Sequence, residues 1–116
     1  MSLSGVQRKF TRDIADLVIY AYEELGYELT YGDAYRSPRV HGDQGERGAA
    51  TYGRTWSAHK QRLAVDFNLF IDGEYQQSTA AFAELGEYWL TLDPDNVWGG
   101  DFDDGNHFSR RYNGIA

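Results

Sequence analysis

The alternation of apolar and polar side chains in residues 64–71 is the clearest structural pattern along this chain. Val65, Phe67, Leu69 and Ile71 fall on one face of an extended strand, and the residues between them fall on the other. The Asp-Gly pair that follows is typical of a tight turn, so a second strand is expected to run back beside the first. The pattern predicts an antiparallel hairpin with one buried face.

The first segment of the chain has the spacing of an amphipathic helix. Ser4, followed three positions later by Gln7, fits a capping box at its start, and Gly26 fits a C-terminal stop. Residues 27–31 then alternate between apolar and polar types, which predicts a short strand. The helical period is carried by Val6, Phe10, Ile14, Leu17, Val18, Ala21 and Leu25.

The remaining segments predict a long loop, a second helix and a final strand. Residues 39–56 contain four glycines and no apolar period, which favours a loop. A helical pattern begins near Ser78 and is broken by the sequence DPDN at 93–96, and a short strand is expected around Phe108. This order of elements favours a single α+β domain over residues 1–116, with two main helices and a small antiparallel sheet.

Composition narrows the classes of function. The chain has no cysteine, so any metal must be held by His, Asp, Glu or backbone oxygen. Eleven basic and eighteen acidic side chains leave a net charge of -7, which argues against a nucleic-acid partner. The chain contains no run of about 18 apolar residues, so we expect no membrane insertion. The N-terminus lacks the pattern of a signal peptide, so we expect synthesis in the cytoplasm, and we expect a monomer.

One carboxylate, Asp66, interrupts the apolar strand. His59 lies seven residues earlier and can approach Asp66 only from a turn before the strand. If Phe108 packs into the core, His107 faces the opposite way and can meet Asp66 on a neighbouring strand. Two imidazoles and one carboxylate suit a zinc site with a position open for water, although a hydrogen-bonded polar cluster would have the same composition. Asp104, three residues before His107, is placed to act as a base without binding the metal.

Three short motifs carry a family resemblance. They are AYRSPR at 34–39, SAHKQRLAVDF at 57–67 and VWGGDFDDGNHF at 97–108. Their order resembles that of the zinc D-alanyl-D-alanine and L-alanyl-D-glutamate peptidases of the VanX/VanY group, which includes many phage endolysins. The resemblance covers roughly residues 27–112.

The resemblance implies a fold and a set of roles. The fold would be of the Hedgehog/D,D-peptidase type, with the sheet beneath a zinc ion. Arg36 would stabilise the developing oxyanion or a substrate carboxylate, and Ser57 would orient the first ligand or a nearby substrate group. Asp104 would take a proton from the attacking water and return it to the leaving amine. The implied zinc ligands are His59, Asp66 and His107.

The chain departs from this pattern in two places. Arg62 occupies the position where a glycine is expected, and the glutamine expected after the Arg-Ser element has no clear counterpart. Trp98 is expected to pack beneath the turn that follows it. Rival candidates also lie close by: Asp101 and Asp103 for the base, Arg39 for the arginine, and His41 as a further imidazole, which is expected to be solvated.

These observations lead to an expected function. The resemblance implies a zinc peptidase that cuts peptidoglycan stem peptides at the L-alanyl-D-glutamate bond, in a phage or prophage setting. It would reach the cell wall after release by a separate lysis factor, or as a virion component. The alternatives are a D,D-carboxypeptidase or dipeptidase, a non-catalytic zinc-containing domain that binds the cell wall, and a metal-free structural domain.

Overall fold

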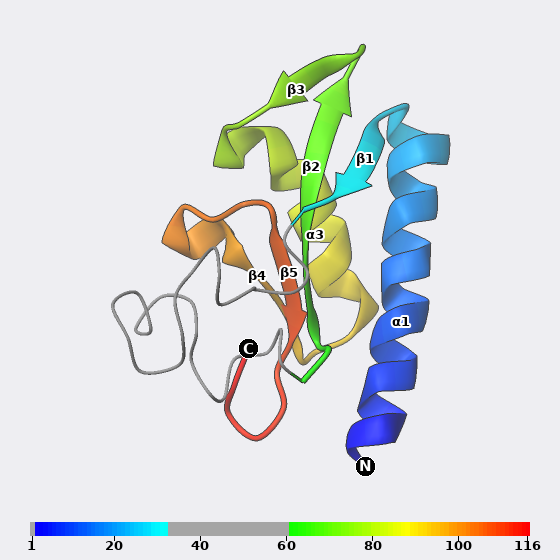
Figure 1. Ribbon diagram of the computed structural model, residues 1–116, viewed down its shortest axis with the longest axis vertical. Helices are drawn as coiled ribbons and strands as arrows, with labels where there is room; N and C mark the ends of the chain where they lie inside the picture. The colour runs from blue at the N-terminus through cyan, green and yellow to red at the C-terminus, as the bar shows by residue number, and fades with distance from the viewer. Residues whose placement is uncertain (1, 33–60) are drawn as a thin grey trace, which may run out of the picture.

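The computed structural model describes residues 2–32 and 61–116, which form a small α+β structure with an antiparallel sheet (Figure 1). This agrees with the fold class expected from the sequence, while the Hedgehog/D,D-peptidase type remains a prediction. In chain order the described elements are α1 (Leu3–Ile19), the π-helical turn η1 (Tyr20–Leu25), β1 (Glu28–Tyr31), β2 (Ala64–Ile71), β3 (Glu74–Gln76), the 3-10 turn η2 (Thr79–Phe82), α3 (Ala83–Leu92), β4 (Asn96–Trp98), the 3-10 turn η3 (Gly99–Phe102) and β5 (His107–Arg110).

Strand β2 is the centre of the sheet. Along the described path the strand order is β1-β2-β5-β4, and β3 also pairs with β2. Because β1 and β3 both pair with Leu69 and Phe70, they must lie on opposite edges of β2. Strand β5 pairs with the other end of β2, from Ala64 to Asp66, on the edge that β3 also uses. The two strands therefore leave a notch between them beside Phe67.

The hairpin turn between β2 and β3 has the geometry that its sequence predicts. Asp72 has a φ angle of 53° and Gly73 has one of 79°, so both lie in the left-handed region. A type I′ turn requires a positive φ angle at both central positions, and Asp-Gly is among the pairs that accept it most readily. The turn returns the chain at Glu74, as expected from the sequence.

The hydrophobic core lies between the sheet and the helices. In Figure 1, α3 lies behind β2 and α1 runs alongside the sheet. Trp89 of α3 is fully buried and meets Phe10 edge-on, with ring centroids 5.6 Å apart. Its indole nitrogen donates to the backbone oxygens of Val97 and Ser109, at 3.0 and 3.1 Å. A single side chain thus joins α1, α3, β4 and β5.

Helix α1 begins earlier than the sequence pattern suggested. The hydroxyl of Ser2 accepts a hydrogen bond from the Gly5 backbone nitrogen at 3.1 Å and caps the helix, so the expected cap at Ser4 is wrong. The helix gains a partial turn because Ser2 offers the same capping chemistry two residues earlier. Gln7 instead donates to the Gln61 backbone oxygen at 2.8 Å. Gly26 ends the helical segment with a φ angle of 70°, as predicted.

A buried charge cluster, called the Asp13 cluster below, ties α1 to the sheet and to the end of α3. Asp13 is 1% exposed, forms an ion pair with Lys9, and accepts from the Asn96 amide at 3.3 Å. Arg110 of β5 lies 3.8 Å from Asp13 and 3.0 Å from Asp93. The five residues provide charges of both signs, so the buried carboxylate is compensated.

The remaining elements follow the sequence closely, with one addition. The hydroxyl of Ser78 caps η2 by accepting a hydrogen bond from the Ala81 backbone nitrogen at 3.3 Å. Helix α3 ends at Leu92, because Asp93 has an extended backbone conformation. The short strand β4 was not predicted, because its three residues begin within the helix-breaking sequence at 93–96 and are too few to show a period. Across residues 2–32 and 61–116, no helix is long and apolar enough to cross a membrane.

Candidate metal centre

Asp66 and His107 face each other on neighbouring strands. They are direct partners in the antiparallel register of β2 and β5, and the imidazole Nδ1 lies 3.4 Å from the carboxylate Oδ1. Each is followed by a phenylalanine that points into the core: Phe67 is 2% exposed and Phe108 is fully buried. Because side chains alternate along a strand, Asp66 and His107 share the face of the sheet opposite the helices. The sequence predicted this meeting.

The two side chains have the donor chemistry of a zinc site. A carboxylate oxygen and an imidazole nitrogen are both ordinary zinc ligands. Asp66 is 5% exposed, and its carboxylate lies beside an imidazole, a group that binds metals readily. Within the described parts of the chain, no group of three or more His, Cys, Asp and Glu side chains could hold a metal ion. Asp66 and His107 alone would supply two of the three protein ligands that a catalytic zinc site uses.

Asp104 is attached to the same site through the backbone. The His107 nitrogen donates to the Asp104 oxygen at 3.0 Å, and the Asp104 nitrogen donates to the Gly99 oxygen at 2.9 Å. Gly99 lies so close beneath this turn that an added Cβ atom would stand 2.2 Å from the Asp104 oxygen and 3.0 Å from the His107 Cβ atom. Only glycine fits there, which explains one residue of the WGGD motif in physical terms.

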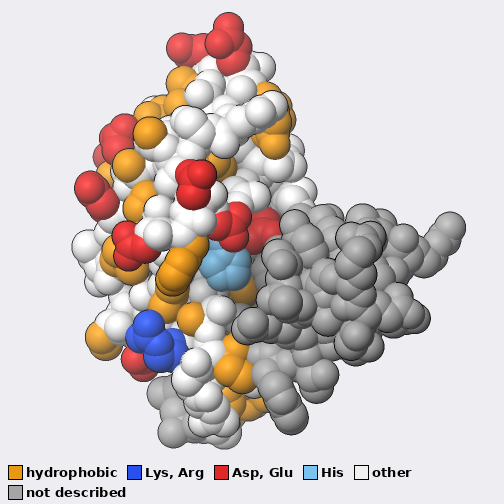
Figure 2. All heavy atoms as spheres, turned by 90° about the vertical axis from the view of Figure 1, so that its left-hand side faces the viewer, with side chains coloured by type: hydrophobic (Ala, Val, Ile, Leu, Met, Phe, Trp, Pro, Cys, Tyr) orange, Lys and Arg blue, Asp and Glu red, His pale blue; other side chains and the backbone are white. Residues whose placement is uncertain are grey.

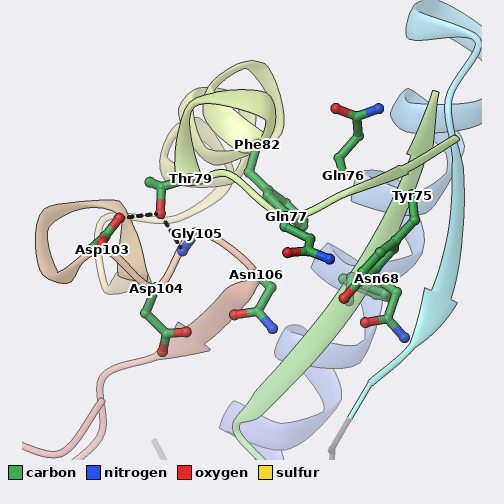
Figure 3. Close-up of a pocket in the computed structure, with 11 residues that line it drawn as sticks. Asn68, Tyr75, Gln76, Gln77, Thr79, Phe82, Asp103, Asp104, Gly105 and Asn106 are labelled. Carbon is green, nitrogen blue, oxygen red and sulfur yellow. Dashed lines mark hydrogen bonds between the residues drawn. The ribbon is translucent and has the colours of Figure 1, made fainter.

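The neighbouring carboxylate has a different task. Asp103 accepts a hydrogen bond from the Thr79 hydroxyl at 2.9 Å, and the same hydroxyl accepts from the Gly105 nitrogen at 3.3 Å. Figure 3 shows Asp103 turned toward Thr79, whereas the Asp104 carboxylate points away from this pair. The contacts assign Asp103 to holding the turn. They favour Asp104 over Asp103 as the candidate base.

Trp98 packs against this turn, as expected from the sequence. Its indole nitrogen donates to the Gly105 oxygen at 2.7 Å. Its ring lies over Gly86 and Gly100, where an added Cβ atom would approach ring atoms to 2.1 and 2.4 Å. The two glycines leave the room that the indole occupies, and the indole supports the segment between β4 and β5.

Arg62 has the backbone conformation for which a glycine was expected. Its φ angle is 57°, in the left-handed region that glycine adopts without a steric cost. The residue lies in a turn directly before β2, and its side chain is exposed. A bulky side chain is therefore accommodated there, at the cost of some backbone strain.

A cavity opens next to Asp104 that the sequence did not predict. It has a volume of about 270 Å³ and lies where β3 and β5 part from β2. Figure 3 shows the side chains of Asn68, Gln77 and Asn106 around it, with the Tyr75 hydroxyl nearby. The one available signal was the position of Asn68, which shares the Asp66 face of β2. Gln77 and Asn106 come from segments without a regular period.

The surface around the site is acidic. Figure 2 shows acidic side chains beside the pale-blue imidazole, while the basic side chains visible in this view lie further down. Acidic residues also crowd the sequence here, since Asp101, Asp103 and Asp104 lie within four positions. The described side chains on this face would attract a cation and repel an anion.

The other residues predicted for the site, His59, Arg36 and Ser57, lie outside the described residues, as does the predicted loop at 39–56. Their roles remain predictions. The sequence matches no protein-family model, and no curated protein matches it either.

Proposed function

We propose that this chain is a zinc-dependent peptidase that hydrolyses peptidoglycan stem peptides, with the L-alanyl-D-glutamate bond as the expected target. The observation that carries the proposal is the placement of Asp66, His107 and Asp104. The first two bring an oxygen and a nitrogen donor together across paired strands, and the third sits in the turn that leads into His107. This arrangement supports metal-assisted hydrolysis better than a purely structural polar cluster, because the turn that leads into His107 also carries an exposed carboxylate, Asp104.

The chain's own residues divide the work. Asp66 and His107, with His59 as the expected third ligand, would hold the ion. Zinc in such a site lowers the pKa of a coordinated water and polarises an amide carbonyl. Asp104 accepts the proton of the attacking water and returns it to the leaving amine. Arg36 is expected to stabilise the negative charge that develops on the substrate oxygen. The wall would be reached after release by a separate lysis factor or from a virion.

The test compares three variants of the full chain. Zinc content is measured by elemental mass spectrometry, and fragments released from purified sacculi are identified by mass spectrometry with and without a chelator. Asp104→Asn is expected to keep one zinc and to lose about 10²- to 10⁴-fold in hydrolysis, the usual share of a general base. His107→Ala is expected to lose both zinc and hydrolysis.

Asp103→Asn is the matched control. It removes a carboxylate one position away, while asparagine still tolerates the left-handed backbone at this residue, where φ is 56°. It should keep both properties. A wild-type protein that holds zinc but leaves sacculi and stem peptides intact would instead be a binding domain, and fragments ending at D-alanine would identify a D,D-carboxypeptidase. A protein without zinc would overturn the proposal.

A further inference from the structure

The cavity described above is lined in part by Asp104, the candidate base of the proposed reaction. Strand β3 ends at Gln76 and β5 begins at His107, so between them Phe67 and Asn68 of β2 pair with neither strand. Asp104 is at one end of this opening and Tyr75 at the other (Figure 3). A substrate held at Asp104 would extend along the opening.

Neutral amides dominate the polar groups around this cavity. Asn68, Gln77 and Asn106 each carry one carbonyl acceptor and one amino group with two donors. Asn68 donates to the Thr30 hydroxyl at 3.2 Å, which fixes the orientation of its amide. The backbone oxygen of Asn106 accepts from the Phe67 nitrogen at 3.0 Å and holds the segment to β2. Side-chain amides of this kind match the donors and acceptors of peptide groups and carboxamides.

The charge of the cavity excludes one kind of ligand. No lysine or arginine is among the described residues that line it, and Asp104 places a carboxylate at one end. The chain as a whole has a net charge of -7. A free carboxylate in the cavity would gain no charged partner from these residues and would be repelled by Asp104.

We propose that this cavity, here called the amide pocket and formed by Asn68, Tyr75, Gln77 and Asn106, is a specificity-determining subsite. It takes an uncharged segment of a stem peptide and prefers a carboxamide over a free carboxylate at that place. The identification of the ligand as a stem peptide rests on the proposed function. The preference for a carboxamide over a carboxylate rests only on the described residues that line the cavity.

The test uses two stem peptides that differ only in one side group, a carboxamide or a carboxylate, next to the expected scissile bond. Binding to the full chain is measured by NMR titration in the presence of a chelator. We expect the carboxamide peptide to bind about tenfold more tightly. Gln77→Ala should weaken its binding about three- to tenfold, because one hydrogen-bonding group is lost.

Gln76 provides the matched control. Gln76 also lines the cavity, but Figure 3 shows its side chain directed away from Gln77 and Asn106, and it donates to the Glu74 backbone oxygen at 3.1 Å. Gln77→Lys should reduce or reverse the preference for the carboxamide peptide, and Gln76→Lys should leave the preference unchanged. Equal binding of the two peptides by the wild type would overturn the inference, as would an equal shift in both lysine variants.

The outcome can be separated from that of the proposed function, because binding and hydrolysis are read independently. The same two peptides are incubated with the zinc-supplemented chain, and cleavage is followed by mass spectrometry. A carboxamide preference in binding without any cleavage would keep the amide pocket and remove the peptidase. Equal binding and equal cleavage of both peptides would keep the peptidase and remove the amide pocket.

Discussion

Two buried aspartates, Asp13 and Asp66, lie on opposite faces of the same sheet and differ in their neighbours. Both are nearly inaccessible, at 1% and 5% exposure. Asp13 lies among permanent cations, Lys9 and Arg110, whereas Asp66 faces an imidazole, a group that also binds metals. Burial of a carboxylate therefore does not by itself indicate chemistry. The type of partner separates a structural carboxylate from a candidate ligand.

The two regions are joined through β5. His107 points to the Asp66 face, and Arg110, three positions further along, points to the helices and enters the Asp13 cluster. Because side chains alternate along a strand, fixing Arg110 also fixes the face that His107 presents. The Asp13 cluster thus holds the strand that carries one of the candidate ligands.

The largest effect is expected from Asp13→Ala. It leaves Arg110 buried without its inner counter-charge, so the free energy of unfolding should fall by about 3–5 kcal/mol. The measurement is urea unfolding of the metal-free full chain. Asp16→Ala is the control on the same helix, because Asp16 pairs with Arg12 at 3.1 Å on the surface and should cost about 0–1 kcal/mol. Equal losses in both variants would remove the distinction between the buried and the exposed pair.

A smaller but more specific effect is expected from Asp66→Asn. Zinc at a hundred times its dissociation constant should stabilise the wild type by about 2.7 kcal/mol, and this gain should disappear in the variant. Thermal unfolding with and without zinc provides the measurement. Asp103→Asn should keep the full gain. If Asp66→Asn also keeps it, Asp66 belongs with Asp13 as a structural carboxylate.

The smallest effect is expected from the exposed hydrogen bond between Tyr27 and Glu84, which has the same length as the Arg110–Asp93 ion pair. Tyr27 donates to Glu84 at 3.0 Å, and this hydrogen bond raises the pKa of the phenol above 10.0. The stabilisation from this contact is present below the unfolded pKa and is lost as the pH rises through the folded pKa. Glu84→Gln should lower the Tyr27 pKa and change the free energy of unfolding by less than about 0.5 kcal/mol.

The Tyr27 titration can be followed by NMR of ring-labelled tyrosine. Tyr88 is an internal reference, because its pKa is raised mainly by burial and should not move in the Glu84 variant. An unchanged Tyr27 pKa would mean that the hydrogen bond to Glu84 is not kept in solution. If Glu84→Gln lowered the free energy of unfolding as much as Asp13→Ala, burial would not determine the size of these effects.

The sequence predicted the parts of the fold in which a period extends over many residues. The alternation around Phe67 located β2, and the same rule applied to Phe108 placed His107 opposite Asp66. The helical period located α1 and α3, although it placed the N-terminal cap at Ser4 instead of Ser2. Long periods are reliable because burial of one face fixes them.

Other parts of the site could not be predicted from a pattern. The amide pocket joins Asn68 to Gln77 and Asn106, which come from segments without a regular period. The Asp13 cluster depends on Arg110 reaching α1 from the last strand, a contact between residues nearly a hundred positions apart. Such pairs are set by tertiary packing, and a single sequence carries no local signal for them.

The two-sided character of β2 limits how this protein can change. Inserting or deleting one residue within the strand would turn Asp66 toward the helices and push a phenylalanine out to the other side, so the core would be lost together with the candidate ligand. Length variation should therefore be tolerated beyond the strand, for example at the exposed Asp72-Gly73 turn. Packing of the apolar face of β2 against the helices fixes the register of the strand, and this register keeps Asp66 opposite His107.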